Sequence, residues 1–173
     1  MSDDQVNAPG VVPRDPVDEA ARRWAERYPG AAGFRALTSL VRAYSATVRE
    51  VERALRPMGL NLSRFEVLLM LSFARAGALP VMRIRDLLMV HGSSVTYLVD
   101  RLADAGWVVR EEQPGDRRVS LVRITDAGRE VIGTAARRLA DAGFGAFGDL
   151  GDDELGALAD LLGALRRPPG SGA

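Results

Sequence analysis

Hydroxyl-bearing side chains crowd one short segment near the middle of the chain, directly after His91. The residues are Ser93, Ser94, Thr96 and Tyr97. At the start of a helix, hydroxyls and free backbone N–H groups can hydrogen-bond to phosphates and to base edges. The segment therefore predicts a DNA-reading helix, and we interpret His91 as a turn residue or phosphate contact rather than a metal ligand. The expected inward face of this helix is made of Val95, Leu98, Val99 and Leu102.

A second cluster of charge lies at the tip of a predicted β-hairpin. Residues 107–112 and 119–124 have the composition of strands, with a Pro-Gly turn between them. Arg117 and Arg118 follow Asp116 and give the tip a cationic point suited to a narrow minor groove. Two short helices followed by such a hairpin make a winged helix-turn-helix, whose second helix lies in the major groove. Double-stranded DNA is the expected partner.

The composition argues against an enzyme. The chain has 173 residues, no Cys and a single His, so it has no disulfide, no thiolate site and no His cluster. It contains neither a phosphate-binding loop nor a nucleophile–base pair in sequence, and we expect no catalysis, no cofactor and no metal site. Because no apolar run approaches the ~18–20 residues of a membrane span, we expect a cytoplasmic protein without a membrane partner.

The formal net charge is zero, but the charges are unevenly distributed. All 23 basic residues are Arg, and residues 21–85 contain twelve Arg against four Glu. Residues 139–165 contain six acidic residues and no basic one. Arginine can bind phosphate or a guanine edge through two parallel hydrogen bonds. The basic part is therefore a candidate for DNA contact, although ordinary solvated helix faces explain the same pattern equally well.

Helix start and stop signals divide the chain into parts, and the expected fold class is mainly α with a small β-hairpin. The parts are a disordered lead (1–14), an extra N-terminal helix (15–30), dimerisation helices (33–57 and 126–167), a winged helix-turn-helix DNA-binding region (60–125) and a disordered tail (168–173). The expected helix caps are Asp15, Ser63 paired with Glu66 in a capping box, Gly106, Thr125 and Asp152.

The long helix over residues 33–57 has apolar residues at alternating spacings of three and four. They are Phe34, Leu37, Val41, Tyr44, Val48, Val51 and Leu55. A sustained 3.5-residue repeat places one narrow stripe along a helix, as at a helix-to-helix seam. The pattern favours contact with a second copy of the chain, and a core helix within one chain is the alternative.

Several runs of residues resemble the MarR family of transcriptional regulators. They are residues 93–102, 106–108, 116–118 and 124–129. The wing sequence Asp-Arg-Arg and the following strand-to-helix junction are the most diagnostic parts, and the similarity extends over about residues 33–166. The resemblance implies an obligate homodimer with intertwined terminal helices that binds a palindromic operator, most often as a repressor released by a small ligand.

The resemblance also implies roles for individual residues. In that pattern Asp116 orients the wing, Arg118 enters the minor groove, Ser94 and Thr96 contact bases, and Ser63 contacts a phosphate. The full set of candidate DNA-binding residues is Ser63, Ser93, Ser94, Thr96, Tyr97, Arg101, Asp116, Arg117 and Arg118.

Tyr97 departs from the family pattern, because many members have Arg at this position. A tyrosine can donate one hydrogen bond to a base or pack on a thymine methyl group. Partial burial beneath the hairpin is the structural alternative for Tyr97. The preferred operator sequence is therefore left open.

The extra N-terminal helix resembles that of the urate-responsive branch of the family. Trp24 and Glu66 lie at positions comparable to ligand-binding residues of that branch. Phe73 and Leu98, however, stand near the positions where the branch has arginines. We therefore do not predict urate as the ligand, and dimer packing is the favoured explanation for Trp24.

A pocket for an aromatic or anionic effector is expected between the long helix and the DNA-binding region. Arg42 is the candidate anchor for an anion. The other candidate lining residues are Trp24, Phe34, Tyr44, Leu60, Phe65, Glu66 and Leu69. Ordinary core packing is an equally good explanation for each of them.

These observations favour a ligand-responsive, DNA-binding homodimer. The alternative is a winged helix used for protein contacts, although such a module would not need two arginines at the hairpin tip. A direct binding titration against DNA discriminates between the two.

Overall fold

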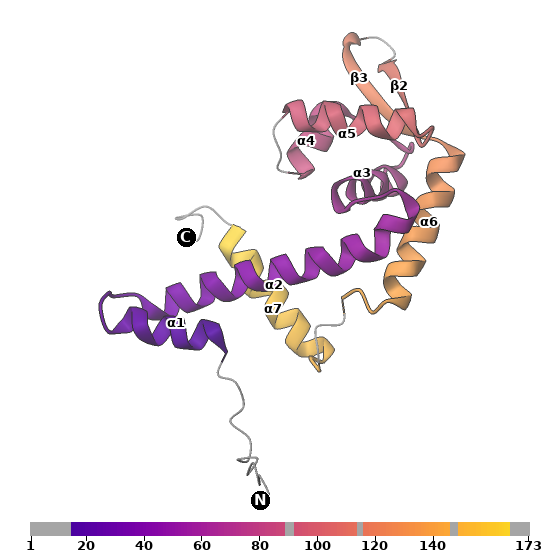
Figure 1. Cartoon of the computed structure of the whole chain (residues 1–173). Helices are drawn as coiled ribbons and strands as arrows, with labels where there is room; N and C mark the ends of the chain where they lie inside the picture. The colour runs from indigo at the N-terminus through magenta and orange to yellow at the C-terminus, as the bar shows by residue number, and fades with distance from the viewer. Residues whose placement is uncertain (1–14, 89–91, 114–115, 146–148, 167–173) are drawn as a thin grey trace, which may run out of the picture. The chain divides into compact units, whose positions relative to one another are not determined.

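The chain forms seven α-helices and three strands over the described residues, which are 15–88, 92–113, 116–145 and 149–166 of a computed structural model (Figure 1). The expected disordered lead and tail lie outside these ranges. The elements are α1 (Pro16–Ala25), α2 (Ala31–Leu55), α3 (Leu62–Phe73), β1 (Ala78–Pro80), α4 (Val81–Leu88), α5 (Gly92–Asp104), β2 (Val108–Gln113), β3 (Asp116–Ile124), α6 (Asp126–Asp141) and α7 (Asp152–Arg166), with a short 3-10 helix (Arg56–Met58) after α2. Residues 1–50 and 51–173 make two compact units.

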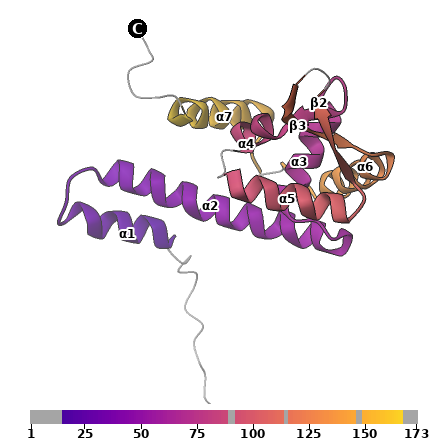
Figure 2. The same cartoon turned by 90° about the horizontal axis from the view of Figure 1, so that it is seen from above.

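The first unit contains α1, which lies beside the first part of α2 (Figure 2). As predicted, Asp15 caps α1, and its carboxylate accepts a hydrogen bond of 2.8 Å from the Val17 amide. Val17 is buried, and an ion pair of 2.6 Å joins Asp18 to Arg35 of α2. This local packing closes the helical hairpin within the chain.

Trp24 belongs to this helical hairpin. Its ring stacks on Phe34 with a centroid distance of 4.4 Å, and its Nε1–H donates a hydrogen bond of 2.8 Å to the Pro29 carbonyl. Contacts within one chain therefore account for both the ring and the N–H group of Trp24. Dimer packing, the explanation favoured from the sequence, is not needed for them.

The second unit has one apolar core, to which α2 contributes only its last turn. All helices of this unit except α7 supply buried residues, as do β2 and β3. Ten of the side chains in the cluster are completely inaccessible to solvent. They are Leu55, Val67, Leu68, Leu71, Ile84, Val95, Val99, Leu102, Val122 and Ala135.

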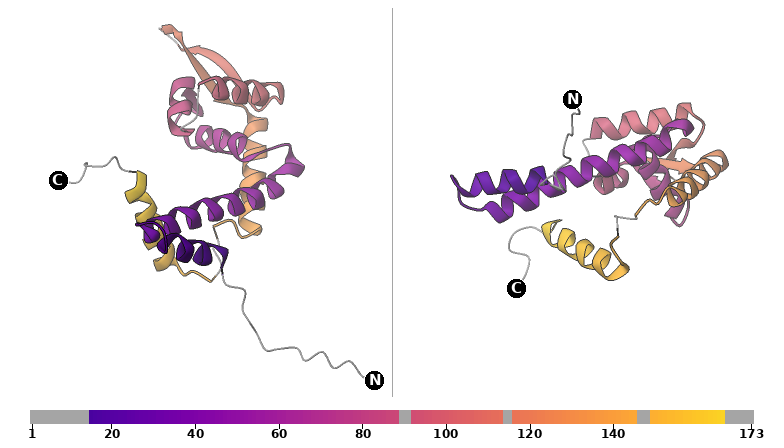
Figure 3. Two further views of the ribbon diagram at one scale, coloured as in Figure 1. Left: turned by 60° about the vertical axis from the view of Figure 1, so that its left-hand side comes forward. Right: turned by 60° about the horizontal axis from the view of Figure 1, so that its bottom comes forward.

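The sheet has three antiparallel strands in the order β1-β3-β2. The β2–β3 hairpin was predicted from the sequence, whereas β1, whose Leu79 pairs with Val122, was not. The hairpin projects from the body of the second unit beyond α5 (Figures 1 and 3). A three-stranded base therefore supports the predicted wing.

Two glycines shape the junctions at the base of the wing. Gly106 ends α5 in the left-handed region, with φ 73°, and the following Trp107 amide donates to the Leu102 carbonyl. At Gly128 an added Cβ would lie well inside contact distance of the Trp107 carbonyl oxygen. Thr125 caps α6 as predicted, because its hydroxyl accepts a hydrogen bond of 3.0 Å from the Gly128 amide. The Thr-x-x-Gly spacing thus serves both the cap and the close packing of α6.

The last two helices differ in packing. α6 buries Ile132, Ala135 and Leu139, whereas α7 buries none of its residues. Asp152 was predicted as the cap of α7 but is its first helical residue. The preceding Gly151 amide instead donates to the Glu154 carboxylate at 2.9 Å. None of the helices described is long and apolar enough to cross a membrane.

Candidate nucleic-acid interface

The helix α5 has an apolar inner face and a polar outer face. Val95, Val99 and Leu102 are fully buried, and Leu98 is 8% exposed, as the sequence predicted. On the opposite side, Ser94, Thr96 and Tyr97 are exposed. His91 and the Ser93 side chain lie outside the described residues. The buried face anchors α5 on the core, and the hydroxyl-bearing face is exposed.

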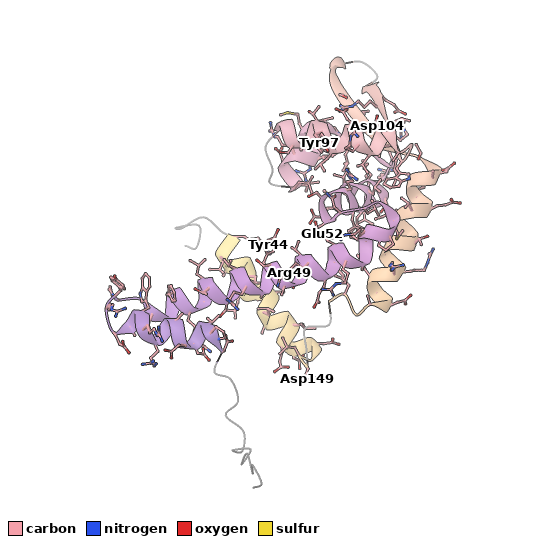
Figure 4. The ribbon with its side chains drawn as sticks, viewed as in Figure 1. Tyr44, Arg49, Glu52, Tyr97, Asp104 and Asp149 are labelled. Carbon is pink, nitrogen blue, oxygen red and sulfur yellow. The ribbon has the colours of Figure 1, made fainter. Side chains whose placement is uncertain are left out.

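Figure 4 labels Tyr97 along α5 and Asp104 at the C-terminal end of the same helix. The Tyr97 side chain is 59% exposed, so the alternative explanation, partial burial beneath the hairpin, is wrong. The Arg101 guanidinium stacks over the ring at 5.7 Å and forms an ion pair of 2.8 Å with Asp104. Arg101 therefore orients Tyr97, while part of its own charge is paired on the same helix.

An ion pair joins the wing to α5. Arg110 on β2 donates a hydrogen bond of 2.7 Å to Asp100 and a longer one of 3.4 Å to the Thr96 carbonyl. The pair fixes strand and helix relative to each other. Neither residue was predicted from the sequence as part of the site, although the helical spacing places Asp100 on the outer face, four residues after Thr96.

The base of the wing has a second cross-strand pair. Arg123 on β3 donates to Glu111 on β2 at 2.8 Å and to the Ala76 carbonyl at 2.7 Å. The guanidinium lowers the pKa of Glu111, and the carboxylate raises that of Arg123. The side chains of Asp116, Arg117 and Arg118 at the tip lie outside those that the structure describes, so their predicted contacts stay predictions.

Ser63 lies in the first turn of α3, but it does not cap this helix. The cap is Asn61, whose side-chain oxygen accepts a hydrogen bond of 2.9 Å from the Arg64 amide. The predicted capping box of Ser63 with Glu66 is therefore wrong, because the helix begins two residues earlier than a cap at Ser63 requires. Ser63 is half-buried at a helix start, a position that is compatible with a phosphate contact.

The predicted effector residues fall into separate groups. In the first unit Phe34 stacks on Trp24, while Arg42 and Tyr44 are exposed on α2, where Figure 4 labels Tyr44. In the second unit Leu60 and Phe65 are buried in the core, at 4% and 6% exposure, so core packing is the correct explanation for both.

Glu66 and Leu69 do line a hollow of about 210 Å³, together with Met70 of α3 and Leu87 and Leu88 of α4. The last three residues were not predicted from the sequence, because their contribution requires α3 and α4 to lie side by side. Burial raises the pKa of the Glu66 carboxyl.

Comparisons with known proteins agree with this geometry. The profile of the MarR family matches residues 58–119. The structure of Sco5413, a MarR family transcriptional regulator from Streptomyces coelicolor, is 39% identical with a TM-score of 0.72, and covers 79% of this chain and 94% of that one.

Two further similar proteins have been solved as complexes, one with DNA and one with a small molecule. A mutant MarR from E. coli in complex with operator DNA is 26% identical, with a TM-score of 0.69, over 76% of this chain and 94% of that one. CouR from Rhodococcus jostii RHA1, bound to p-coumaroyl-CoA, is 28% identical, with a TM-score of 0.68, over 79% of this chain and 92% of that one.

Proposed function

Because the chain belongs to the MarR family of DNA-binding transcriptional regulators, we propose that it acts as a repressor, bound as a homodimer to a palindromic operator and released by a small molecule. The observation that carries this proposal is the outer face of α5, where Ser94, Thr96 and Tyr97 are exposed above a fully buried apolar face. Such a helix suits the major groove, where hydroxyls can bond to base edges.

The wing supports the same assignment. Because Arg110 pairs with Asp100, a groove contact by the hairpin and one by α5 would form in a defined relative position. We assign Asp116, Arg117 and Arg118 at the tip, and Ser63 at the start of α3, to backbone or minor-groove contacts. Ser93 and Arg101 complete the proposed DNA-binding set.

Exposed apolar side chains support a homodimer. On α2, Leu37 is 63% exposed and Val41 is 54% exposed, and on α7 Leu161 and Leu165 are 68% and 72% exposed. Apolar stripes of this kind mark protein interfaces. A twofold dimer presents two identical reading heads, which matches a palindrome with half-sites about 10 bp apart.

A ligand would act by geometry. If it favours a spacing of the two α5 helices that no longer matches successive major grooves, the dimer leaves the operator. CouR, which has been solved with p-coumaroyl-CoA, supports a ligand-responsive regulator on this fold. We assign the small-molecule effector of this chain to the hollow beside Glu66.

The proposal is tested by titrating the purified protein against a labelled DNA fragment from upstream of its own coding region. Random-sequence DNA at equal salt is the control. We expect binding to the upstream fragment at least ~10³-fold tighter than to the control. Equal, salt-sensitive binding to both contradicts an operator in that fragment. A folded dimer that binds neither contradicts the proposal and favours a winged helix used for protein contacts.

A further inference from the structure

The hollow between α3 and α4 combines an apolar lining with a single carboxylate. Leu69, Met70, Leu87 and Leu88 supply the apolar surface, and Glu66 supplies the acid. Its volume is about 210 Å³. This is smaller than a typical pocket for a drug-sized ligand. The hollow therefore suits a small molecule with an apolar body.

The carboxylate of Glu66 has no hydrogen bond or ion pair within the part of the chain that the structure describes. Its role as a capping partner of Ser63 is excluded, because Asn61 caps α3. A half-buried carboxylate without a partner is costly, and burial alone raises its pKa. A positively charged ligand would offset that cost.

We propose that this hollow binds a small organic cation, an amine or quaternary ammonium with an apolar body, whose charged end pairs with Glu66. The inference rests on the proposed function, since the cation would be the effector that releases DNA. It differs from the anionic aromatic expected from the sequence, because Arg42 does not line this hollow. The adaptable thioether of Met70 fits ligands of varied shape.

The hollow is positioned to act on the DNA-reading helix. α4 packs against both α3 and α5. Leu87 and Leu88 form the end of α4, and α5 begins at Gly92. A ligand that separates the end of α4 from α3 would therefore displace the start of α5, where the exposed hydroxyl groups lie.

The experiment compares three small probes of similar size by isothermal titration calorimetry with the full chain. Phenethylamine is cationic at neutral pH, 2-phenylethanol is its neutral counterpart, and phenylacetate is an anion. We expect phenethylamine to bind at least ~10-fold more tightly than phenylacetate, because only the cation forms a charge-assisted hydrogen bond with Glu66.

Two variants assign the effect to the hollow. Glu66→Gln keeps the shape of the side chain, and we expect it to weaken phenethylamine binding roughly tenfold while 2-phenylethanol binding stays unchanged. Glu130→Gln removes an exposed carboxylate from α6 and is the matched control, which should leave all three affinities unchanged. Equal affinity for cation and anion, or an affinity insensitive to Glu66→Gln, would overturn the proposal.

The operator titration separates this inference from the proposed function. We expect saturating phenethylamine to weaken operator binding by the wild-type chain and not by Glu66→Gln. Binding through Glu66 that leaves DNA affinity unchanged would overturn the effector role. A chain that binds phenethylamine through Glu66 but never binds DNA would overturn the proposed function and leave the cation site standing.

Discussion

The helices α5 and α7 distribute their apolar residues in opposite ways. In α5 the four residues of the inner face are at most 8% exposed, and the outer face carries hydroxyl groups. In α7 no residue is buried, and Leu161 and Leu165 are 68% and 72% exposed.

This difference shows what each helix requires from outside the chain. The inner face of α5 is satisfied by its own core, so its outer face is free to meet a polar partner such as DNA. The leucines of α7 find no such cover within the described chain, and an apolar surface of this kind marks a protein contact. A second copy of the chain supplies one in the proposed dimer.

The largest expected effect comes from adding charge to α7. Leu161→Asp combined with Leu165→Asp should weaken dimerisation by about 3–6 kcal/mol, because burying each leucine contributes about 1.5–3 kcal/mol. Light scattering measures the mass, and far-UV circular dichroism checks the helical content. Asp160→Asn on the same helix is the control. A stable dimer that carries both aspartates would show that α7 does not form the interface.

The next effect lies on the inner face of α5. Leu102 is fully buried, and Leu102→Ala should lower the free energy of unfolding by about 2–5 kcal/mol through lost burial and a residual cavity. Chemical denaturation measures this loss. Tyr97→Ala on the outer face should change stability by no more than about 0.5 kcal/mol. Similar losses for both variants would contradict the assignment of the two faces.

Tyr97→Ala should matter for binding instead of folding. If Tyr97 contacts a base, the variant should lose about 1–3 kcal/mol of operator affinity, while its affinity for random DNA at equal salt stays the same. Tyr97→Phe removes the hydroxyl group and keeps the ring, so retained operator affinity would assign the contact to ring packing. An equal loss of affinity for operator and random DNA would instead assign Tyr97 to a contact with the DNA backbone.

The smallest effect concerns Glu66, an acid on an otherwise apolar surface. Because its pKa is raised in the folded chain, its protonation stabilises the fold below the unfolded value of about 4.5. That contribution is lost as the pH rises through the folded pKa. Glu66→Gln should therefore raise the melting temperature slightly at pH 7, with an advantage that disappears near pH 4. A constant difference across this range would contradict burial as the cause.

Much of the DNA-binding unit could be predicted because its signals are local. The cap at Thr125, the stop at Gly106 and the inward face of α5 each depend on residues within one or two helical turns. The same holds for the β2–β3 hairpin, whose turn residues and alternating strands are adjacent in the chain.

The errors occur where the local pattern allows two outcomes or carries no signal. Asn61 and Ser63 are both good caps, and only the extended backbone of Asn61 (φ −120°, ψ 173°) selects the first. The strand β1 is three residues long and ends in Pro80, so it carries no periodic signal and is defined only by pairing with β3.

The sequence by itself determined the winged helix-turn-helix and which side of its reading helix faces outward, because hydrophobic periodicity and helix-ending residues act over short distances. Tertiary structure alone decided the surroundings of single side chains. It stacked Trp24 on Phe34, joined Arg110 to Asp100, and placed Glu66 beside Leu87 and Leu88. Each of these contacts joins two separate elements. Its formation depends on how those elements pack, and a local sequence pattern does not predict that packing.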